Sequence, residues 1–283
     1  MNSQAKVTVV VPTRNRSVAL SGLLSSLHCQ SLTRFNVIIG VHGNQSWHPH
    51  LDKLSAALGV RGIELTVCDC IGMTFSEMHS RMLNQAQTEY VCRLDDDHVS
   101  DPTYLATLLK VIERDEKAGA VGGVVLHPDV PGIEFSENEF LEALFAGRTK
   151  GILNTILQLK RHPTNKLLKV PDLYSTFMVK KKTILAVGGI ATCYRSSSYR
   201  EETDLTLRMT FAGYNQYVVP VAFVTHVRAD YGGERMDQAE WQRLRAKNEQ
   251  IFQKHLKAWC KNPVEHFAPL WDQAIADARS FKG

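Results

Sequence analysis

Hydrophobic positions along the chain alternate between short continuous runs and helically spaced sets. Residues 7–11 are a nearly continuous β-branched run ended by Pro12, the pattern of a parallel strand buried on both faces. Leucines recur at helical spacing in residues 20–27, and residues 35–41 form the next apolar run. A strand, a helix and a second strand in this order predict a βαβ unit at the start of the chain.

Further elements extend this alternation. Apolar runs predict strands at 63–67, 90–92, 120–126, 175–179 and 217–226, and helically spaced positions predict helices at 75–86, 104–112 and 205–211. The pattern is that of an α/β fold with a mostly parallel central sheet.

Two regions depart from the alternation. Residues 128–172 carry several prolines and acids without a regular period, so we interpret them as an insertion with an irregular path. Residues 234–261 have apolar positions at helical spacing among basic ones and predict a long amphipathic helix. We therefore expect one domain over residues 1–230 and a C-terminal helical extension over 231–283.

Composition narrows the class of protein. The chain has 283 residues, 44% of them hydrophobic and 22% charged, which suits a globular fold with ample core and excludes a disordered chain. Its net charge of +4 suits anionic ligands without requiring nucleic acid. The six cysteines form no CxxC pair and are expected to be reduced thiols. No leader or membrane-spanning stretch is evident, so we expect a cytoplasmic protein.

The first candidate for chemistry is a run of three acids. Asp95, Asp96 and Asp97 directly follow the apolar residues 90–92, which places them at the carboxyl end of a strand, where open α/β sheets bind ligands. Adjacent carboxylates stay ionised together only beside a cation, and Mg²⁺ or Mn²⁺ prefers oxygen ligands. A solvated turn or a helix N-cap is the alternative interpretation.

A second set of candidates lies near the end of the strand pattern. Glu201, Glu202 and Asp204 fall in the first turn of the helix that ends at Gly213. Acids there favour the helix dipole, but one of them is also a candidate general base. His226 ends the last apolar run, where a histidine serves as a structural hydrogen-bonding group or as a metal ligand.

In this order, the motifs resemble those of the inverting glycosyltransferases of family 2. The similar segments are 9–16 (VVVPTRNR), 94–97 (LDDD), 201–208 (EETDLTLR) with 212–214 (AGY), and the strand from Val219 and Pro220 to His226. The resemblance implies the GT-A fold, a Rossmann-like three-layer sandwich, with residues 1–230 as its catalytic domain. The insertion at about 128–172 would then lie near the acceptor side.

The resemblance also implies roles for individual residues. Asp97, Asp95 and His226 would hold a divalent metal, Mn²⁺ or Mg²⁺, on the diphosphate of a nucleotide-sugar donor. Asp95 and Asp96 would contact that donor together with Pro12, Thr13, Arg14, Arg16 and His42. Glu202 would be the catalytic base, with Glu201 and Asp204 as competing candidates.

Two departures from the family pattern concern the donor. Relatives carry an aspartate after the second strand that hydrogen-bonds the nucleotide base, whereas this chain has Val41, His42, Gly43 and Asn44 there. The resemblance therefore does not predict uracil recognition. The helix after Gly72 also lacks the usual Ala-Arg-Asn triplet, which leaves Arg81 and Arg93 as alternatives for a phosphate or base contact.

The expected function is metal-dependent, inverting transfer of a sugar to a hydroxyl acceptor, which is a carbohydrate, a lipid-linked molecule or a small molecule. A sugar-nucleotide nucleotidyltransferase is the enzymatic alternative, but residues 12–16 contain none of the glycines expected of its phosphate loop. A degenerate GT-A fold that only binds a partner is the alternative of a different class.

Besides the donor and acceptor, the possible partners are nucleic acid, a second subunit and a membrane surface. No nucleic acid is expected, and a homodimer is left open. The basic, tryptophan-containing helix suits peripheral contact with an anionic membrane. Packing of that helix against the catalytic domain or a second subunit is favoured, because Glu240 and Glu249 interrupt its basic face.

Overall fold

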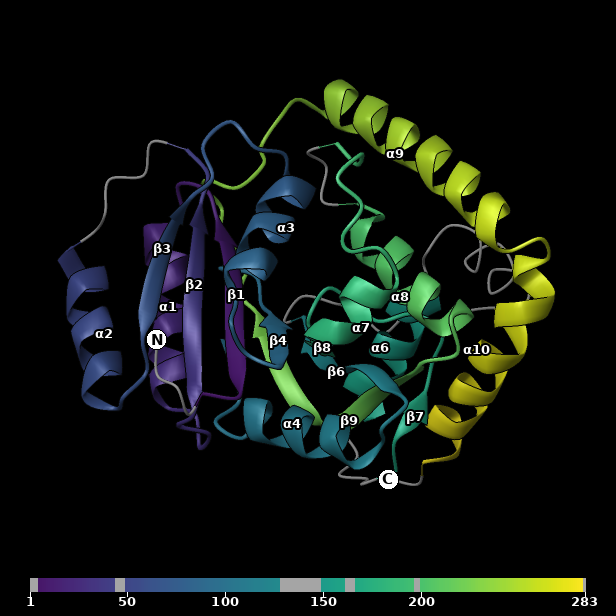
Figure 1. Ribbon diagram of the computed structural model, residues 1–283, viewed down its shortest axis with the longest axis horizontal. Helices are drawn as coiled ribbons and strands as arrows, with labels where there is room; N and C mark the ends of the chain where they lie inside the picture. The colour runs from purple at the N-terminus through teal and green to yellow at the C-terminus, as the bar shows by residue number, and fades with distance from the viewer. Residues whose placement is uncertain (1–4, 44–48, 128–148, 161–165, 196–198, 282–283) are drawn as a thin grey trace.

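A single twisted sheet forms the centre of the molecule. The computed structural model of the chain describes residues 5–43, 49–127, 149–160, 166–195 and 199–281 (Figure 1). Among these residues the strand order is β3-β2-β1-β4-β8-β6-β9-β5, and β7 pairs with β9. The strands are β1 (Val7–Thr13), β2 (Phe35–Val41), β3 (Leu65–Asp69), β4 (Tyr90–Arg93), β5 (His98–Ser100), β6 (Ala118–Leu126), β7 (Leu168–Lys169), β8 (Phe177–Lys180) and β9 (Asn215–His226).

Parallel pairing dominates the half of the sheet that precedes the acids. β1 pairs in parallel with both β2 and β4, and β2 pairs in parallel with β3. β6 and β9 are a further parallel pair, whereas β8, β5 and β7 run antiparallel to their neighbours. The predicted mostly parallel α/β sheet is confirmed, although the antiparallel direction of β8 was not foreseen.

Helices cover both faces of this sheet and give three layers. The helices are α1 (Ser17–His28), α2 (Pro49–Val60), α3 (Phe75–Gln85), α4 (Tyr104–Arg114), α6 (Thr149–Lys160), α7 (Lys181–Ala186), α8 (Glu201–Phe211), α9 (Gln238–Trp259) and α10 (Pro263–Ser280). One apolar core lies between the sheet and α1, α2 and α4. A second core lies between the opposite face and α3, α6, α7, α8 and α10.

The register of the parallel strands gathers polar loops at one edge. Val10 of β1 pairs with Arg93, the last residue of β4, and Thr13 pairs with Val41, the last residue of β2. The loops that follow these three strands therefore leave the sheet side by side. This places the loop after Thr13, the turn at His42 and the three acids next to one another.

The segment predicted as an irregular insertion contains a regular helix. α6 buries Ile152, Leu153 and Leu157 in the second core. Asn154 of α6 donates to the backbone carbonyl of Val125 at 2.7 Å and accepts from its backbone N–H at 2.8 Å. The expectation of an irregular path is therefore wrong for 149–160, where the apolar residues follow helical spacing. Residues 128–148 and 161–165 of the expected insertion lie outside the described residues.

The C-terminal extension consists of two helices that pack on the rest of the chain. Phe252 and Leu256 of α9 are buried against Tyr194 and Leu207. α9 runs along the outside of the molecule and is followed by α10 (Figure 1), which inserts Trp271 into the second core. No helix among the described residues is long and apolar enough to cross a membrane.

Candidate active site

A cavity of ≈ 290 Å³ lies at the carboxyl ends of β1, β2 and β4. It is lined by Pro12, Thr13, Arg14, Arg16, His42, Phe75, Met78, Asp95, Asp96, Asp97, Gly233, Glu234 and Trp241. The structure thus brings together the seven residues to which the resemblance assigned donor contacts, whereas Arg81 and Arg93, the alternatives for a phosphate or base contact, do not line this cavity. The sequence reasoning missed the last three, which come from the C-terminal side of β9, and it missed the apolar pair from α3.

The loop after β1 supplies the cation nearest to the acids. The Arg16 guanidinium Nη1 lies 3.1 Å from Oδ1 of Asp96 and 2.8 Å from Oδ2 of Asp97. The Thr13 hydroxyl donates to the other oxygen of Asp96 at 2.7 Å. Burial raises the pKa of Asp96 to about 6, against the effects of Thr13 and Arg16. The charges of the acids are therefore partly balanced by a side chain of the protein itself.

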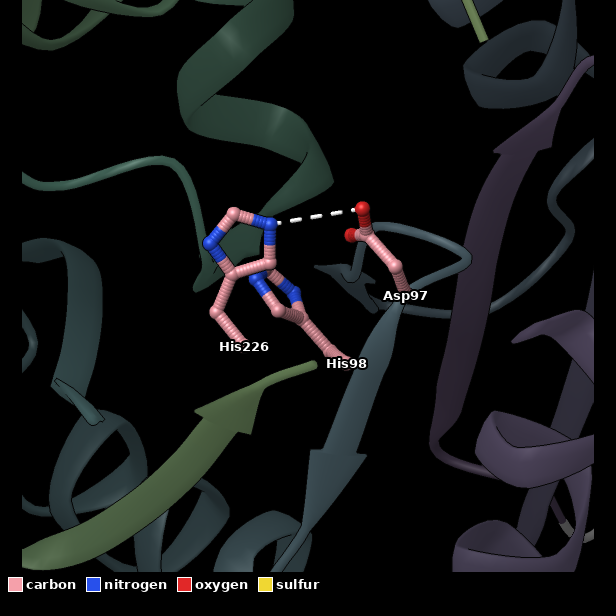
Figure 2. Close-up of side chains that lie close together, drawn as sticks. All are labelled: Asp97, His98 and His226. Atoms are coloured by element: carbon pink, nitrogen blue, oxygen red, sulfur yellow. Dashed lines mark ion pairs between the residues drawn. The ribbon is translucent and has the colours of Figure 1, made fainter. Parts of the chain in front are cut away.

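Asp97, His98 and His226 form a cluster in which candidate metal-binding atoms lie within 4.8 Å of one another (Figure 2). β5 and β9 place the two histidines opposite each other, and His226 Nε2 lies 3.3 Å from Oδ2 of Asp97. Burial alone would raise the pKa of Asp97, but the hydrogen bond and charge of His226, followed by His98 and Arg16, lower it below its usual value. Two of the three predicted metal ligands thus lie together.

Asp95, the third predicted ligand, lies beside this cluster rather than in it. Its Oδ1 is buried and has no hydrogen-bond partner, and Nε of Arg93 lies 4.0 Å from it. The backbone N–H of Asp95 donates to Nδ1 of His98 at 3.2 Å. His98 was missed from the sequence, because the short strand β5 that turns its ring toward His226 has no apolar pattern of its own.

A further histidine lies behind His226. His226 Nδ1 lies 3.3 Å from Nδ1 of His127, the residue after β6, and His127 Nε2 lies 3.4 Å from the Tyr174 hydroxyl. The hydrogen bond to Asp97 raises the pKa of His226. Burial, reinforced by His226, His98 and Arg228, lowers the pKa of His127 to about 4. The His127 ring is therefore neutral at physiological pH.

Glu202, the predicted base, does not line the donor cavity. It lines a separate space of ≈ 30 Å³ together with Arg93 and Glu201. Nη2 of Arg93 lies 3.4 Å from Oε1 of Glu201, so Arg93 connects the acids at the end of β4 to the acids at the start of α8. The Asp95 and Glu202 regions, far apart in sequence, are thus electrostatically linked.

Lys150 of α6 holds the Glu202 carboxylate. Its Nζ lies 3.1 Å from Oε1 of Glu202, donates to the Thr203 hydroxyl at 2.9 Å and lies 3.5 Å from Asp172. Oε2 of Glu202 is buried and accepts no hydrogen bond. Burial alone would raise the pKa of Glu202, but Lys150 and Arg93 lower it, whereas burial and the Glu202 charge raise the pKa of Glu201. Glu202 is therefore the ionised member of the pair.

Asp204, the other competing candidate, has partners that hold elements together. Its carboxylate accepts hydrogen bonds from the Tyr194 hydroxyl at 2.8 Å and from Arg208 Nε at 2.6 Å, and His255 Nδ1 of α9 lies at 2.9 Å. The side chain is fully buried. These contacts give Asp204 a structural role and favour Glu202 as the residue that is available for chemistry.

The segment between β9 and α9 closes one side of the cavity. The backbone N–H of Gly233 donates to the Arg14 carbonyl at 2.7 Å, and Arg16 Nε donates to the Tyr231 carbonyl at 3.2 Å. Gly233 has φ +71°, and a Cβ there would lie 2.5 Å from Nη2 of Arg16. The positive φ favours glycine here, and a side chain at this position would also have to displace the Arg16 guanidinium.

Comparisons with known protein structures agree with this fold. A mannosyltransferase from Pyrobaculum calidifontis, PcManGT, solved with GDP-Man and Mn²⁺, is similar with a TM-score of 0.61 and 16% sequence identity, over 100% of this chain and 77% of that chain. TarS 1-349 from S. aureus is similar with a TM-score of 0.55 and 15% identity, over 96% of this chain and 80% of that chain. These similarities show the fold.

Sequence comparison identifies the family. The curated proteins give no match. The model of the family described as glycosyltransferase like family 2 matches residues 4–148, about half of the chain. This match includes β1 with its loop, β2 and the three acids, and it favours a glycosyltransferase over both alternatives considered from the sequence. The chain therefore belongs to glycosyltransferase like family 2 and is a glycosyltransferase with the GT-A fold.

Proposed function

We propose that the protein is a metal-dependent, inverting glycosyltransferase that moves a sugar from a nucleoside-diphosphate donor to a hydroxyl acceptor. The observation that carries the proposal is the cavity at the strand ends, which the three acids and the loop after β1 line, with His226 3.3 Å from Asp97. Arg93 connects this cavity to the ionised Glu202. The proposed donor site and the proposed base are therefore linked through the charge of Arg93.

The side chains in the cavity and of the adjacent His226 suit a hard or borderline divalent ion. Asp97 and His226 already have ligand atoms 3.3 Å apart, and the buried Oδ1 of Asp95 has no hydrogen-bond partner. Carboxylate oxygen and imidazole nitrogen together are ligands that Mn²⁺ accepts. We propose these three residues as metal ligands. A bound metal would supply Lewis-acid stabilisation of the negative charge on the departing diphosphate.

The remaining residues of the cavity would bind the nucleotide. Arg14 is placed for contact with phosphate, and Pro12 and Thr13 form the wall beside it. His42 has a buried Nδ1 without a hydrogen-bond partner, in the position where relatives carry the base-binding aspartate. We propose that His42 meets the nucleotide base. Because PcManGT was solved with GDP-Man, that sugar nucleotide is the first donor to test.

Glu202 would act as the base. Lys150 occupies Oε1 and leaves the buried Oε2 to accept a proton from the acceptor hydroxyl. The acceptor oxygen would then form a bond to the anomeric carbon as the bond to the diphosphate breaks on the opposite side, which inverts the anomeric centre. Burial and the charge of Glu202 raise the pKa of Glu201 to about 8, so Glu201 would already hold a proton at neutral pH and would not take up this one.

Calorimetry tests the donor and metal parts of the proposal. Wild-type protein is titrated with GDP, UDP, CDP and GDP-Man, each with and without Mn²⁺. We expect one nucleotide to bind more tightly with Mn²⁺, and Asp97→Asn to lose that dependence. Asp272→Asn on α10, an exposed aspartate outside the cavity, is the matched control. Absence of Mn²⁺-dependent binding of any of these nucleotides would contradict the proposal.

A further inference from the structure

We infer that His127 is a positioning residue that orients the His226 ring for metal binding. The inference rests on the proposed metal site. It concerns a residue outside the donor cavity and outside the cluster of Asp97, His98 and His226. The observation that carries it is the contact between Nδ1 of His127 and Nδ1 of His226 at 3.3 Å.

The chemistry of imidazole determines the direction of this contact. A neutral imidazole carries one proton, so one ring nitrogen donates and the other is a lone-pair ligand. His226 Nε2 faces Oδ2 of Asp97 at 3.3 Å and is therefore the nitrogen aimed at the metal position (Figure 2). With Nε2 given to a metal, Nδ1 of His226 would carry the proton, and His127 Nδ1 is placed to accept it. Such a partner fixes the tautomer and the ring orientation of a metal ligand.

His127 is itself held in place by two different elements. Its backbone N–H donates to Oε1 of Gln158 at 3.1 Å, and its carbonyl accepts from Nε2 of Gln158 at 2.6 Å. The remaining ring nitrogen, Nε2, lies 3.4 Å from the Tyr174 hydroxyl. With its Nδ1 accepting from His226, the His127 ring carries its proton on Nε2 and donates to Tyr174. A continuous series of contacts therefore runs from Asp97 through His226 and His127 to Tyr174.

The other histidine near His226 does not serve this purpose. His98 approaches His226 edge to face, with ring centroids 5.1 Å apart. Its Nδ1 already accepts the backbone N–H of Asp95 at 3.2 Å. Orientation of the His226 ring through its Nδ1 is therefore assigned to His127.

Mn²⁺ titration of the whole 283-residue chain, followed by electron paramagnetic resonance of the free ion, tests the inference without any substrate. We expect His127→Leu to weaken Mn²⁺ binding by about 10- to 100-fold, the usual effect of losing such a partner. His127→Asn places an amide oxygen near the former Nδ1, so we expect it to retain affinity within about threefold of wild type. His266→Leu, which removes an exposed histidine on α10, should bind like wild type.

Each contrary outcome overturns a defined statement. If wild type binds Mn²⁺ and His127→Leu binds it equally well, the inference is wrong while the metal site stands. If the Asn and Leu variants lose affinity equally, a hydrogen-bond acceptor at the Nδ1 position is not what His127 contributes, and the inference is also wrong. If wild type binds no Mn²⁺, both the inference and the proposed metal dependence fail.

A measurement on the unmodified protein covers the case in which His127→Leu does not fold. Histidine ¹⁵N spectra of the wild type with Zn²⁺, a diamagnetic ion that binds imidazole, report which ring nitrogen carries the proton. We expect His226 to be protonated on Nδ1 and His127 on Nε2. Protonation of His127 on Nδ1 would overturn the inference.

Discussion

Glu202 and Asp97 each form an ion pair with a basic side chain from a distant part of the sequence. Lys150 reaches Glu202 from α6, and Arg16 reaches Asp97 from the loop after β1. The side chains of Asp97 and Glu202 are only 7% and 12% exposed, and for each the neighbouring basic groups outweigh the effect of burial and lower the pKa. The ionised state of the two residues therefore depends on partners that can be removed one at a time.

Glu202→Gln tests the base directly. Glutamine keeps the shape of the side chain but cannot take up a proton, so we expect transfer to fall by about 10²- to 10⁴-fold. Donor affinity by calorimetry should stay close to that of wild type, because Glu202 does not line the donor cavity. Glu201→Gln is the matched control. Its transfer rate should fall much less, because the raised pKa of about 8 means that Glu201 already holds a proton at neutral pH. Near-normal transfer by Glu202→Gln would move the role to another acid.

Lys150→Met tests how Glu202 stays ionised at low pH. The base is active as a carboxylate, so kcat/KM should fall as the pH drops through the pKa of Glu202. Lys150 lowers this pKa, and its loss should therefore move the acidic limb of the profile upward by about 1–3 pH units. Lys150→Arg keeps the charge and should leave the limb closer to its original position. An acidic limb that does not move in Lys150→Met would refute the role given to Lys150.

At the scale of elements, the donor cavity depends on the segment between β9 and α9. Gly233 donates to the Arg14 carbonyl, and Gly232 faces the Asn15 and Arg14 carbonyls so closely that a Cβ would overlap them. The C-terminal side of the chain thus packs on the loop that precedes α1. Contacts with this segment and the ion pairs with Asp96 and Asp97 together hold Arg16 in position.

Gly233→Ala is expected to disturb both stability and nucleotide binding. Its φ of +71° makes alanine unfavourable, and the added Cβ would meet Arg16. Gly62→Ala is a matched control, because Gly62 has φ +73° and open space around its Cβ position. Both variants should lose about 1–2 kcal/mol in denaturant unfolding from the backbone alone. Only Gly233→Ala should also weaken nucleotide binding; equal binding by the two variants would show that the contact is unimportant.

Much of the element order and of the donor cavity could be predicted from sequence, because strands buried on both faces are continuous apolar runs. The acids, His42 and Thr13 lie at the carboxyl ends of such strands, and this is why their positions in the sequence pointed to one edge of the sheet. Lys150 and His127 were missed because their importance comes only from contacts across the fold, 52 residues from Glu202 and 99 from His226. α6 was missed because prolines around it obscured four helically spaced apolar residues.

At the scale of the whole molecule, α9 and α10 enclose the α8 side of the protein (Figure 1). α9 faces inward with Phe252 and Leu256, and Arg200 at the start of α8 pairs with Glu249 of α9 at 2.7 Å. Arg245 stacks on Trp241 and on Tyr199. The apolar and aromatic side chains of the helix are thus largely engaged within the protein.

A vesicle flotation assay tests the consequence of this packing. Because the apolar face of α9 is covered, we expect the protein to stay with the unbound fraction on vesicles of neutral lipid. Vesicles with anionic lipid should retain it only weakly at low salt and release it near 0.15 M salt, where surface charges are screened. Salt-resistant flotation would show instead that α9 leaves the protein surface to enter the lipid.

The contact of Arg16 with Asp96 and Asp97 has a consequence for how strongly metal binding and donor binding affect each other. The Arg16 guanidinium is a counter-ion supplied by the protein itself. It reduces the repulsion between the carboxylates of Asp96 and Asp97 when no ligand is bound, so the cavity keeps its shape. At the proposed metal site a divalent ion would have to exchange with this arginine, and the released guanidinium would then pair with an anion such as the donor diphosphate. Ion and donor should therefore strengthen each other's binding by the same factor, as thermodynamic reciprocity requires.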